Sequence, residues 1–77
     1  MRNKTLDKAI KGSFFKIIKL PAGFHKAQLI RIGLCEGDKL FCMQRLPGGT
    51  IIVQKNRQEI AIGFDLAKHI EILLETK

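Results

Sequence analysis

Residues 28–46 read QLIRIGLCEGDKLFCMQRL, and this stretch decides how the rest of the chain folds. Its first part has the spacing of a short helix. Gly33 follows at the point where a helix needs a left-handed residue in order to stop, a conformation that glycine adopts without steric cost. Gly37 and Asp38 mark a second turn just before an apolar strand. We therefore expect a helix, a turn that depends on Gly33 and Gly37, and a strand, with the other strands paired around this corner.

The residues before this stretch predict one strand and the start of the helix. Residues 12–20, GSFFKIIKL, alternate as a strand does, and we place Phe15 and Ile17 on the core side. A twist or bulge would let Leu20 turn inward as well. A proline and a glycine then end the strand, and residues 24–32 have helical spacing.

The first eleven residues are a polar lead-in. Thr5 is placed to cap a single turn over residues 6–8. Leu6 and Ile10 are the only large apolar residues of this segment, so we expect both of them to anchor it to the rest of the protein.

The residues that follow predict several short strands joined by turns. Residues 38–46 are apolar on both faces near their middle, which predicts a central strand covered on both sides. The further expected elements are a hairpin turn at 47–49, a strand at 50–53, a turn at 55–57 with Asn56 left-handed, a strand at 58–62 with Ile60 and Ile62 inside, a 3₁₀ turn at 65–68 and a last strand at 70–74.

About five strands with one short helix inserted after the first predict a mainly β fold, a small SH3-like, partly open barrel. Closing the sheet would remove its exposed edges. The 77 residues predict a single domain, 1–77, with its core over about residues 5–74. A chain of this length buries only roughly 60% of its unfolded surface, so its stability is marginal without assistance.

The formal net charge of +7 predicts an acidic partner, which means nucleic acid, an anionic membrane surface or an acidic protein face. The basic residues are scattered among apolar ones, and the chain has no Trp or Tyr for base stacking, so nucleic acid is the less favoured partner. Two cysteines and a polar start without a signal-like apolar core predict a cytoplasmic protein.

The titratable residues show no catalytic arrangement. The carboxylates have no pairing that implies acid–base chemistry, and no nucleophile has an activating neighbour, so we expect neither an enzyme nor a cofactor. A metal site made of His25, Cys35 and an acid, either Glu36 or Asp38, is conceivable. The favoured interpretation is that Cys35 is a free surface thiol, that Cys42 is a small core residue and that His69 lies on the surface.

The predicted helix has two apolar sides, and a helix of this length cannot bury both of them in a small barrel. One side carries Leu29 and Ile32. The other side is a candidate docking surface, unless Phe24 folds back over the end of the barrel. With the basic residues beside it, this surface consists of Phe24, Lys26, Ala27, Ile30 and Arg31.

Several motifs occur in a fixed order, and together they resemble the FeoA family of small cytosolic proteins of bacterial ferrous iron uptake. They are Leu29-x-x-Ile32-Gly33-Leu34-x-x-Gly37, Pro47-Gly48-Gly49, Ile60-Ala61-Ile62 and Ala67-x-x-Ile70. The resemblance covers about residues 5–74. It implies an SH3-like barrel that binds the cytoplasmic, GTP-binding part of the ferrous iron permease at the inner face of the membrane, without catalysis. The same domain also occurs fused to metal-responsive repressors.

The chain departs from the family pattern at two positions. Gln28 and Gly63 stand where the family usually has arginine or, at the second position, another polar residue. Two alternatives stay open. The middle third, with its glycine–aspartate turn, also looks like AbrB-like, swapped-hairpin DNA-binding regulators, although that likeness leaves residues 58–74 unexplained. The second alternative is a homo-oligomer that pairs through its exposed apolar patch.

Overall fold

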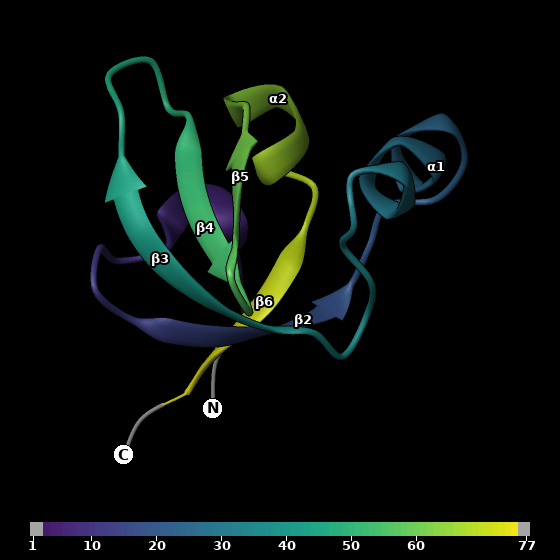
Figure 1. Ribbon diagram of the computed structural model, residues 1–77. Coiled ribbons are helices and arrows are strands. Elements are labelled where there is room, and N and C mark those ends of the chain that lie inside the picture. The colour runs from purple at the N-terminus through teal and green to yellow at the C-terminus, as the bar shows by residue number, and fades with distance from the viewer. Residues whose placement is uncertain (1–2, 76–77) are drawn as a thin grey trace.

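The computed structural model describes residues 3–75 and shows a mainly β protein (Figure 1). Within these residues, six strands form one antiparallel sheet in the order β1-β6-β2-β3-β4-β5. The strands are β1 (Asn3–Thr5), β2 (Phe14–Lys19), β3 (Lys39–Arg45), β4 (Ile51–Lys55), β5 (Gln58–Ile62) and β6 (Glu71–Glu75). The helical segments are the 3₁₀ turn η1 (Leu6–Lys8), the helix α1 (Phe24–Arg31) and the short helix α2 (Phe64–Ala67).

The expected mainly β, partly open architecture with one short helix after its first long strand is confirmed, and the sheet is not closed. In the described part of the chain, β1 pairs with β6 alone and β5 with β4 alone, so both remain edge strands. The expectation that closure would remove the edges is therefore wrong. β1 is short and β5 carries outward polar residues, and both features limit pairing with another chain.

The lead-in contains a strand that sequence reasoning missed, because β1 is only three residues long and has no apolar alternation. Ala9 is buried instead of Ile10, which is 55% exposed. The Thr5 hydroxyl bonds to the Asp7 carboxylate and caps no backbone N–H, so the predicted cap is wrong although the turn is present. From β3, the Arg45 guanidinium donates to the carbonyls of Asp7 and Ala9 at 2.8 and 2.6 Å, and this holds the lead-in in place.

The core lies on the inner side of the sheet, and η1, α1 and α2 contribute Leu6, Leu29 and Ala67 to it. Phe15 and Ile17 are buried as predicted, and the register of β2 against β6 shifts between Ile17 and Lys19. This bulge turns Leu20 inward, which was also predicted. The buried side chains are Leu6, Ala9, Phe15, Ile17, Leu20, Leu29, Leu34, Leu40, Cys42, Ile51, Val53, Ile60, Ile62, Ala67, Ile70 and Ile72.

The strand β3 is central in the sheet, as predicted, but only one of its faces is fully covered. Leu40 and Cys42 are buried, whereas Phe41 and Met43 on the other face are half-buried. The predicted turn at Asn56 is confirmed by its positive φ of 56°. The segment after β5 is a turn of α-helix and not the predicted 3₁₀ turn.

Candidate functional site

The corner between α1 and β3 forms as the sequence predicts. Gly33 has a φ of +103°, in the left-handed region. The N–H of Leu34 donates to the carbonyl of Leu29 at 2.9 Å, and the N–H of Gly33 donates to that of Ile30 at 3.0 Å. This pair of bonds is the Schellman motif, and the two leucines are both buried beneath it. The end of α1 is thus fixed to the core.

The second glycine ties the corner to the sheet. Gly37 has a φ of +92°, and its N–H donates to the carbonyl of Ile17 at 2.7 Å. The N–H of Ile17 in turn donates to the carbonyl of Asp38 at 2.9 Å. These bonds attach the turn to the middle of β2, so α1 has a defined position beside the sheet.

An ion pair that sequence reasoning missed also stabilises the corner between α1 and β3. The Asp38 carboxylate accepts the N–H of Cys35 at 2.8 Å and lies 2.9 Å from the Lys55 ammonium. Lys55, at the end of β4, also donates to the carbonyl of Gly33 at 2.5 Å. The sequence placed Lys55 in a turn and offered no signal for this contact, because 17 positions separate the two charged residues.

The suggested metal site is not assembled. Within residues 3–75, no three His, Cys, Asp or Glu side chains lie close enough to hold a metal ion. Asp38 is engaged by Lys55, and the Glu36 carboxylate accepts the N–H of Leu20 at 3.1 Å. His25 lies instead beside His69, with 5.7 Å between the ring centres and 20° between the ring planes. Sequence reasoning had treated these two histidines separately.

The two cysteines occupy the positions expected of them. Cys35 is an exposed free thiol, and Cys42 is a buried free thiol in β3. Burial raises the pKa of the Cys42 thiol above its ordinary value of 9.0, against smaller lowering effects of the Arg45 charge and of a hydrogen bond with the backbone of Gln44. Cys42 therefore stays protonated at neutral pH and acts as a small apolar core residue.

The outer face of α1 is the most prominent apolar feature outside the core. Phe24 is 74% exposed and does not fold back over the sheet, and Ile30 is 48% exposed. Ala27, between them on the same face, is exposed too. Of the other predicted side, Leu29 is buried, but Ile32, the C-cap residue of α1, is 38% exposed. We call Phe24, Ala27 and Ile30 the helix patch.

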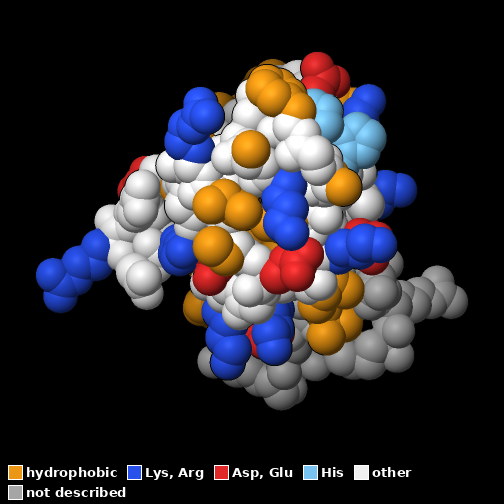
Figure 2. Space-filling model, turned by 90° about the vertical axis from the view of Figure 1, so that its right-hand side faces the viewer, with side chains coloured by type: hydrophobic (Ala, Val, Ile, Leu, Met, Phe, Trp, Pro, Cys, Tyr) orange, Lys and Arg blue, Asp and Glu red, His pale blue; other side chains and the backbone are white. Residues whose placement is uncertain are grey.

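The helix patch lies in basic surroundings. Lys26 and Arg31 are both exposed on α1, and the helix has no acidic residue in its sequence FHKAQLIR. The side of the molecule that carries α1 shows hydrophobic side chains close to lysine and arginine side chains (Figure 2). A surface that combines apolar and basic groups is suited to a partner with an apolar groove and acidic groups at its rim.

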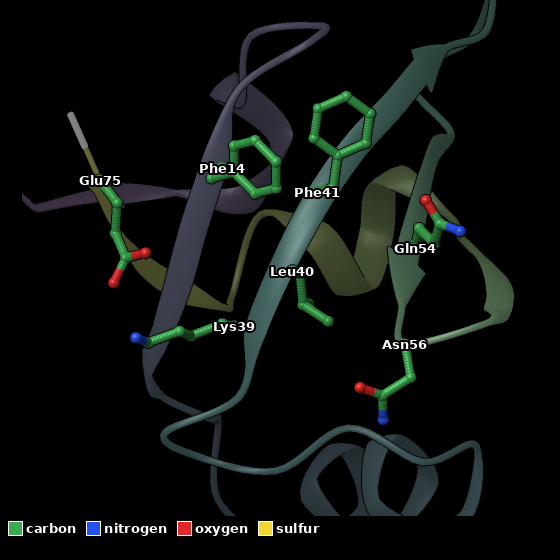
Figure 3. A pocket seen from close by; sticks show the side chains of 7 residues that line it. All are labelled: Phe14, Lys39, Leu40, Phe41, Gln54, Asn56 and Glu75. Carbon is green, nitrogen blue, oxygen red and sulfur yellow. The ribbon is translucent and has the colours of Figure 1, made fainter. Parts of the chain in front are cut away.

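A second apolar feature lies on the outer face of the sheet. Phe14 of β2 and Phe41 of β3 contact each other with their ring centres 4.8 Å apart. They line a shallow hollow of about 300 Å³, which also includes the charged residues Lys39 and Glu75 (Figure 3). The hollow is open and carries one positive and one negative side chain, so its charge favours neither an anionic nor a cationic ligand.

Comparison with known proteins identifies the family of the chain. The sequence pattern of the FeoA domain matches residues 4–73, which is nearly the whole chain. The chain belongs to the FeoA domain family. No curated protein sequence matches it.

Solved structures with FeoA in their names share this fold. The structure is similar to the crystal structure of an iron uptake regulatory protein, FeoA, with a TM-score of 0.85 and 20% identity over 97% of this chain and 100% of the other. It is also similar to a FeoA-like protein from Clostridium acetobutylicum, with a TM-score of 0.86 and 16% identity over 100% of this chain and 92% of the other.

The FeoA fold also occurs within larger regulators. The manganese regulator SloR matches with a TM-score of 0.84 and 16% identity, over 94% of this chain but only 34% of the regulator. At these identities the likeness concerns the fold. The family match includes β5, α2 and most of β6, which the alternative, a swapped-hairpin DNA-binding domain, left unexplained.

Proposed function

We propose that this FeoA-domain protein is an accessory protein of ferrous iron uptake, which binds the cytoplasmic, GTP-binding part of the ferrous iron permease and supports or regulates transport. Membership of the FeoA family supports the role in iron transport. We further propose that the protein acts by binding and not as an enzyme.

The helix patch is the observation that carries the proposal. Phe24 and Ile30 are large apolar side chains at exposed positions, although their neighbour Leu29 is fully buried. Exposed apolar groups that are contiguous and surrounded by polar residues mark interaction sites. The Schellman motif and the Asp38–Lys55 pair hold α1 in place without a partner, so binding need not pay for ordering the helix.

The charge of α1 supports an acidic partner surface. Lys26 and Arg31 project from the helix that carries the patch, and the chain as a whole has a formal net charge of +7. Such charges speed association and fix the orientation of the complex more than they add affinity. In the described residues no helix is long and apolar enough to cross a membrane. We propose that binding to the permease recruits the protein to the inner face of the membrane.

The test is a binding titration of the full chain against the purified cytoplasmic domain of the permease. Replacing Ile30→Glu puts a charge into the helix patch, and we expect a loss of affinity of roughly thirtyfold or more, as for an interface hot spot. Ile10→Glu is the matched control, because Ile10 is 55% exposed and precedes β2, whereas α1 follows β2 at its other end (Figure 1).

The outcomes separate the possible interpretations. Retained affinity in Ile10→Glu together with lost affinity in Ile30→Glu supports the helix patch as the docking surface. Equal affinity of Ile30→Glu and the unaltered chain excludes the patch. The absence of binding by the unaltered chain, in the presence or absence of guanine nucleotide, contradicts the permease as the partner. A shift of Ile30→Glu from dimer to monomer in light scattering would assign the patch to self-association.

A further inference from the structure

We infer that His25 and His69 form a two-histidine chelating site for divalent transition metal ions that favour imidazole ligands, such as Zn²⁺. This goes beyond the proposed binding of the permease. The two residues are 44 positions apart in the sequence, and the fold places their rings side by side. They are the only histidines of the chain, and Figure 2 shows both imidazoles adjacent to one another at the surface.

The separation of the rings fits a shared ion. Imidazole nitrogens bind Zn²⁺ at about 2.0–2.1 Å, so two rings on one ion have their centres roughly 5–6 Å apart. The centres of the His25 and His69 rings are 5.7 Å apart. The ring planes lie 20° apart, and rotation about the side-chain torsions of these two exposed residues points one nitrogen of each ring at the same position.

Both rings are attached to fixed parts of the backbone. His25 lies in the first turn of α1, one turn before the buried Leu29. The N–H of His69 donates to the carbonyl of Leu66 at 3.0 Å, and the next residue, Ile70, is fully buried. Since Leu29 and Ile70 belong to the same core, the backbone positions of the two histidines are fixed relative to each other without a metal.

The ring nitrogens are available to a ligand. In the part of the chain that the structure describes, no side-chain hydrogen bond involves either imidazole. Both residues are exposed, so water can fill the remaining coordination positions of a bound ion. The ammonium of the neighbouring Lys68 lies 5.5 Å from the centre of the Phe64 ring and 4.0 Å from the Asp65 carboxylate.

The nature of the ligands sets the choice of metal. Imidazole suits Zn²⁺, Cu²⁺ and Ni²⁺, and for a given set of nitrogen ligands Fe²⁺ binds more weakly than these ions. With two protein ligands, the site would hold its ion exchangeably, unlike a structural zinc site with four protein ligands. The expected ligand is therefore a free, borderline-soft divalent ion, and the site is not a folding element.

The test is a titration of the full chain with Zn²⁺ alone, followed through the ring resonances of both histidines by NMR. We expect both rings to respond along one binding curve with one ion per chain. Two ligands in one molecule bind roughly a hundredfold more tightly than one alone, so His25→Gln and His69→Gln should each lower the affinity by about that factor. Circular dichroism confirms that each exposed substitution leaves the fold intact.

Cys35→Ser is the matched control, because Cys35 is the exposed thiol that could bind Zn²⁺ instead. Unchanged affinity in Cys35→Ser supports the two-histidine site. Three results would overturn it: an unchanged affinity in either histidine variant, separate binding curves for the two rings, or loss of binding in Cys35→Ser. None of these results bears on the permease, whose binding is measured with Ile30→Glu in the absence of metal.

Discussion

Leu29 and Ile30 are adjacent residues of similar hydrophobicity, and α1 uses them in opposite ways. Leu29 is 0% exposed and Ile30 is 48% exposed. A helix turns by about 100° per residue, so neighbours in the sequence project in different directions. Leu29 therefore contributes to folding and Ile30 is available to a partner. The comparison shows that the direction of an apolar side chain on this helix decides whether it is buried in the core or exposed to solvent.

Removing the inner residue should have the largest effect on stability. Leu29→Ala leaves a cavity in the core and should lower the free energy of unfolding by about 2–5 kcal/mol. Urea denaturation monitored by circular dichroism measures this value. Ile30→Ala is the control on the outer side and should stay within about 0.5 kcal/mol of the unaltered protein. Similar losses in the two variants would show that α1 does not divide into an inner and an outer side.

The next effect concerns the ion pair beneath the end of α1. Asp38→Ala leaves the N–H of Cys35 without its acceptor and the ammonium of Lys55 without its carboxylate partner, so we expect a loss of about 1–3 kcal/mol in the same denaturation experiment. Asp65→Ala is the control, because the Asp65 side chain is 94% exposed and lies 4.0 Å from Lys68. That surface pair should contribute less than about 1 kcal/mol. Equal effects would mean that Asp38 has no structural role at the corner.

Backbone conformation at the corner should give a smaller effect. Gly37 has a φ of +92° with open space where a Cβ would be, so Gly37→Ala adds backbone strain of roughly 1–2 kcal/mol without a clash. Gly63 also has open space around it but an ordinary φ of −68°. Gly63→Ala should therefore be neutral or stabilise the fold by up to about 1 kcal/mol. The difference between the two melting temperatures isolates the left-handed conformation, and its absence would contradict this role of Gly37.

The smallest effect on stability is expected on the outer side of α1. Ile30→Glu should change the free energy of unfolding by less than about 0.5 kcal/mol, because the side chain is exposed. The same variant is expected to lose binding of the permease domain. Stability and binding would thus separate between two adjacent residues. A large destabilisation by Ile30→Glu would instead show that the outer side takes part in folding, and the loss of binding could then not be assigned to the patch.

Local sequence patterns were sufficient for most of the elements. The helix, the left-handed Gly33, the bulge that buries Leu20 and the inward residues of β5 were all predicted correctly. Each of these follows from residues within one turn or a few strand positions of each other. The lead-in was predicted less well, because β1 and the anchoring of its neighbours by Arg45 depend on strands far along the chain.

In the candidate site, too, some features were predicted from local sequence and others depend on distant contacts. The exposure of Phe24, Ala27 and Ile30 follows from helical periodicity and from the small size of the core, and it was predicted. The pairing of His25 with His69 was not predicted, since neither residue has a neighbour in the sequence that points to the other. The departures from the family pattern at Gln28 and Gly63 have no structural explanation, although the carbonyl of Gly63 accepts the N–H groups of Leu66 and Ala67 in α2.

The sequence by itself determined the class of the fold, the corner at Gly33 and Gly37 and the two sides of α1, because periodicity and backbone sterics act locally. Tertiary structure alone decided that β1 and β5 are the edge strands of the sheet, that Asp38 meets Lys55 and that the two histidines are adjacent. Each of these depends on which strands pair and on how the helices pack on the sheet. Such contacts join residues that are distant in the chain, and the energy that selects them comes from burying the shared core.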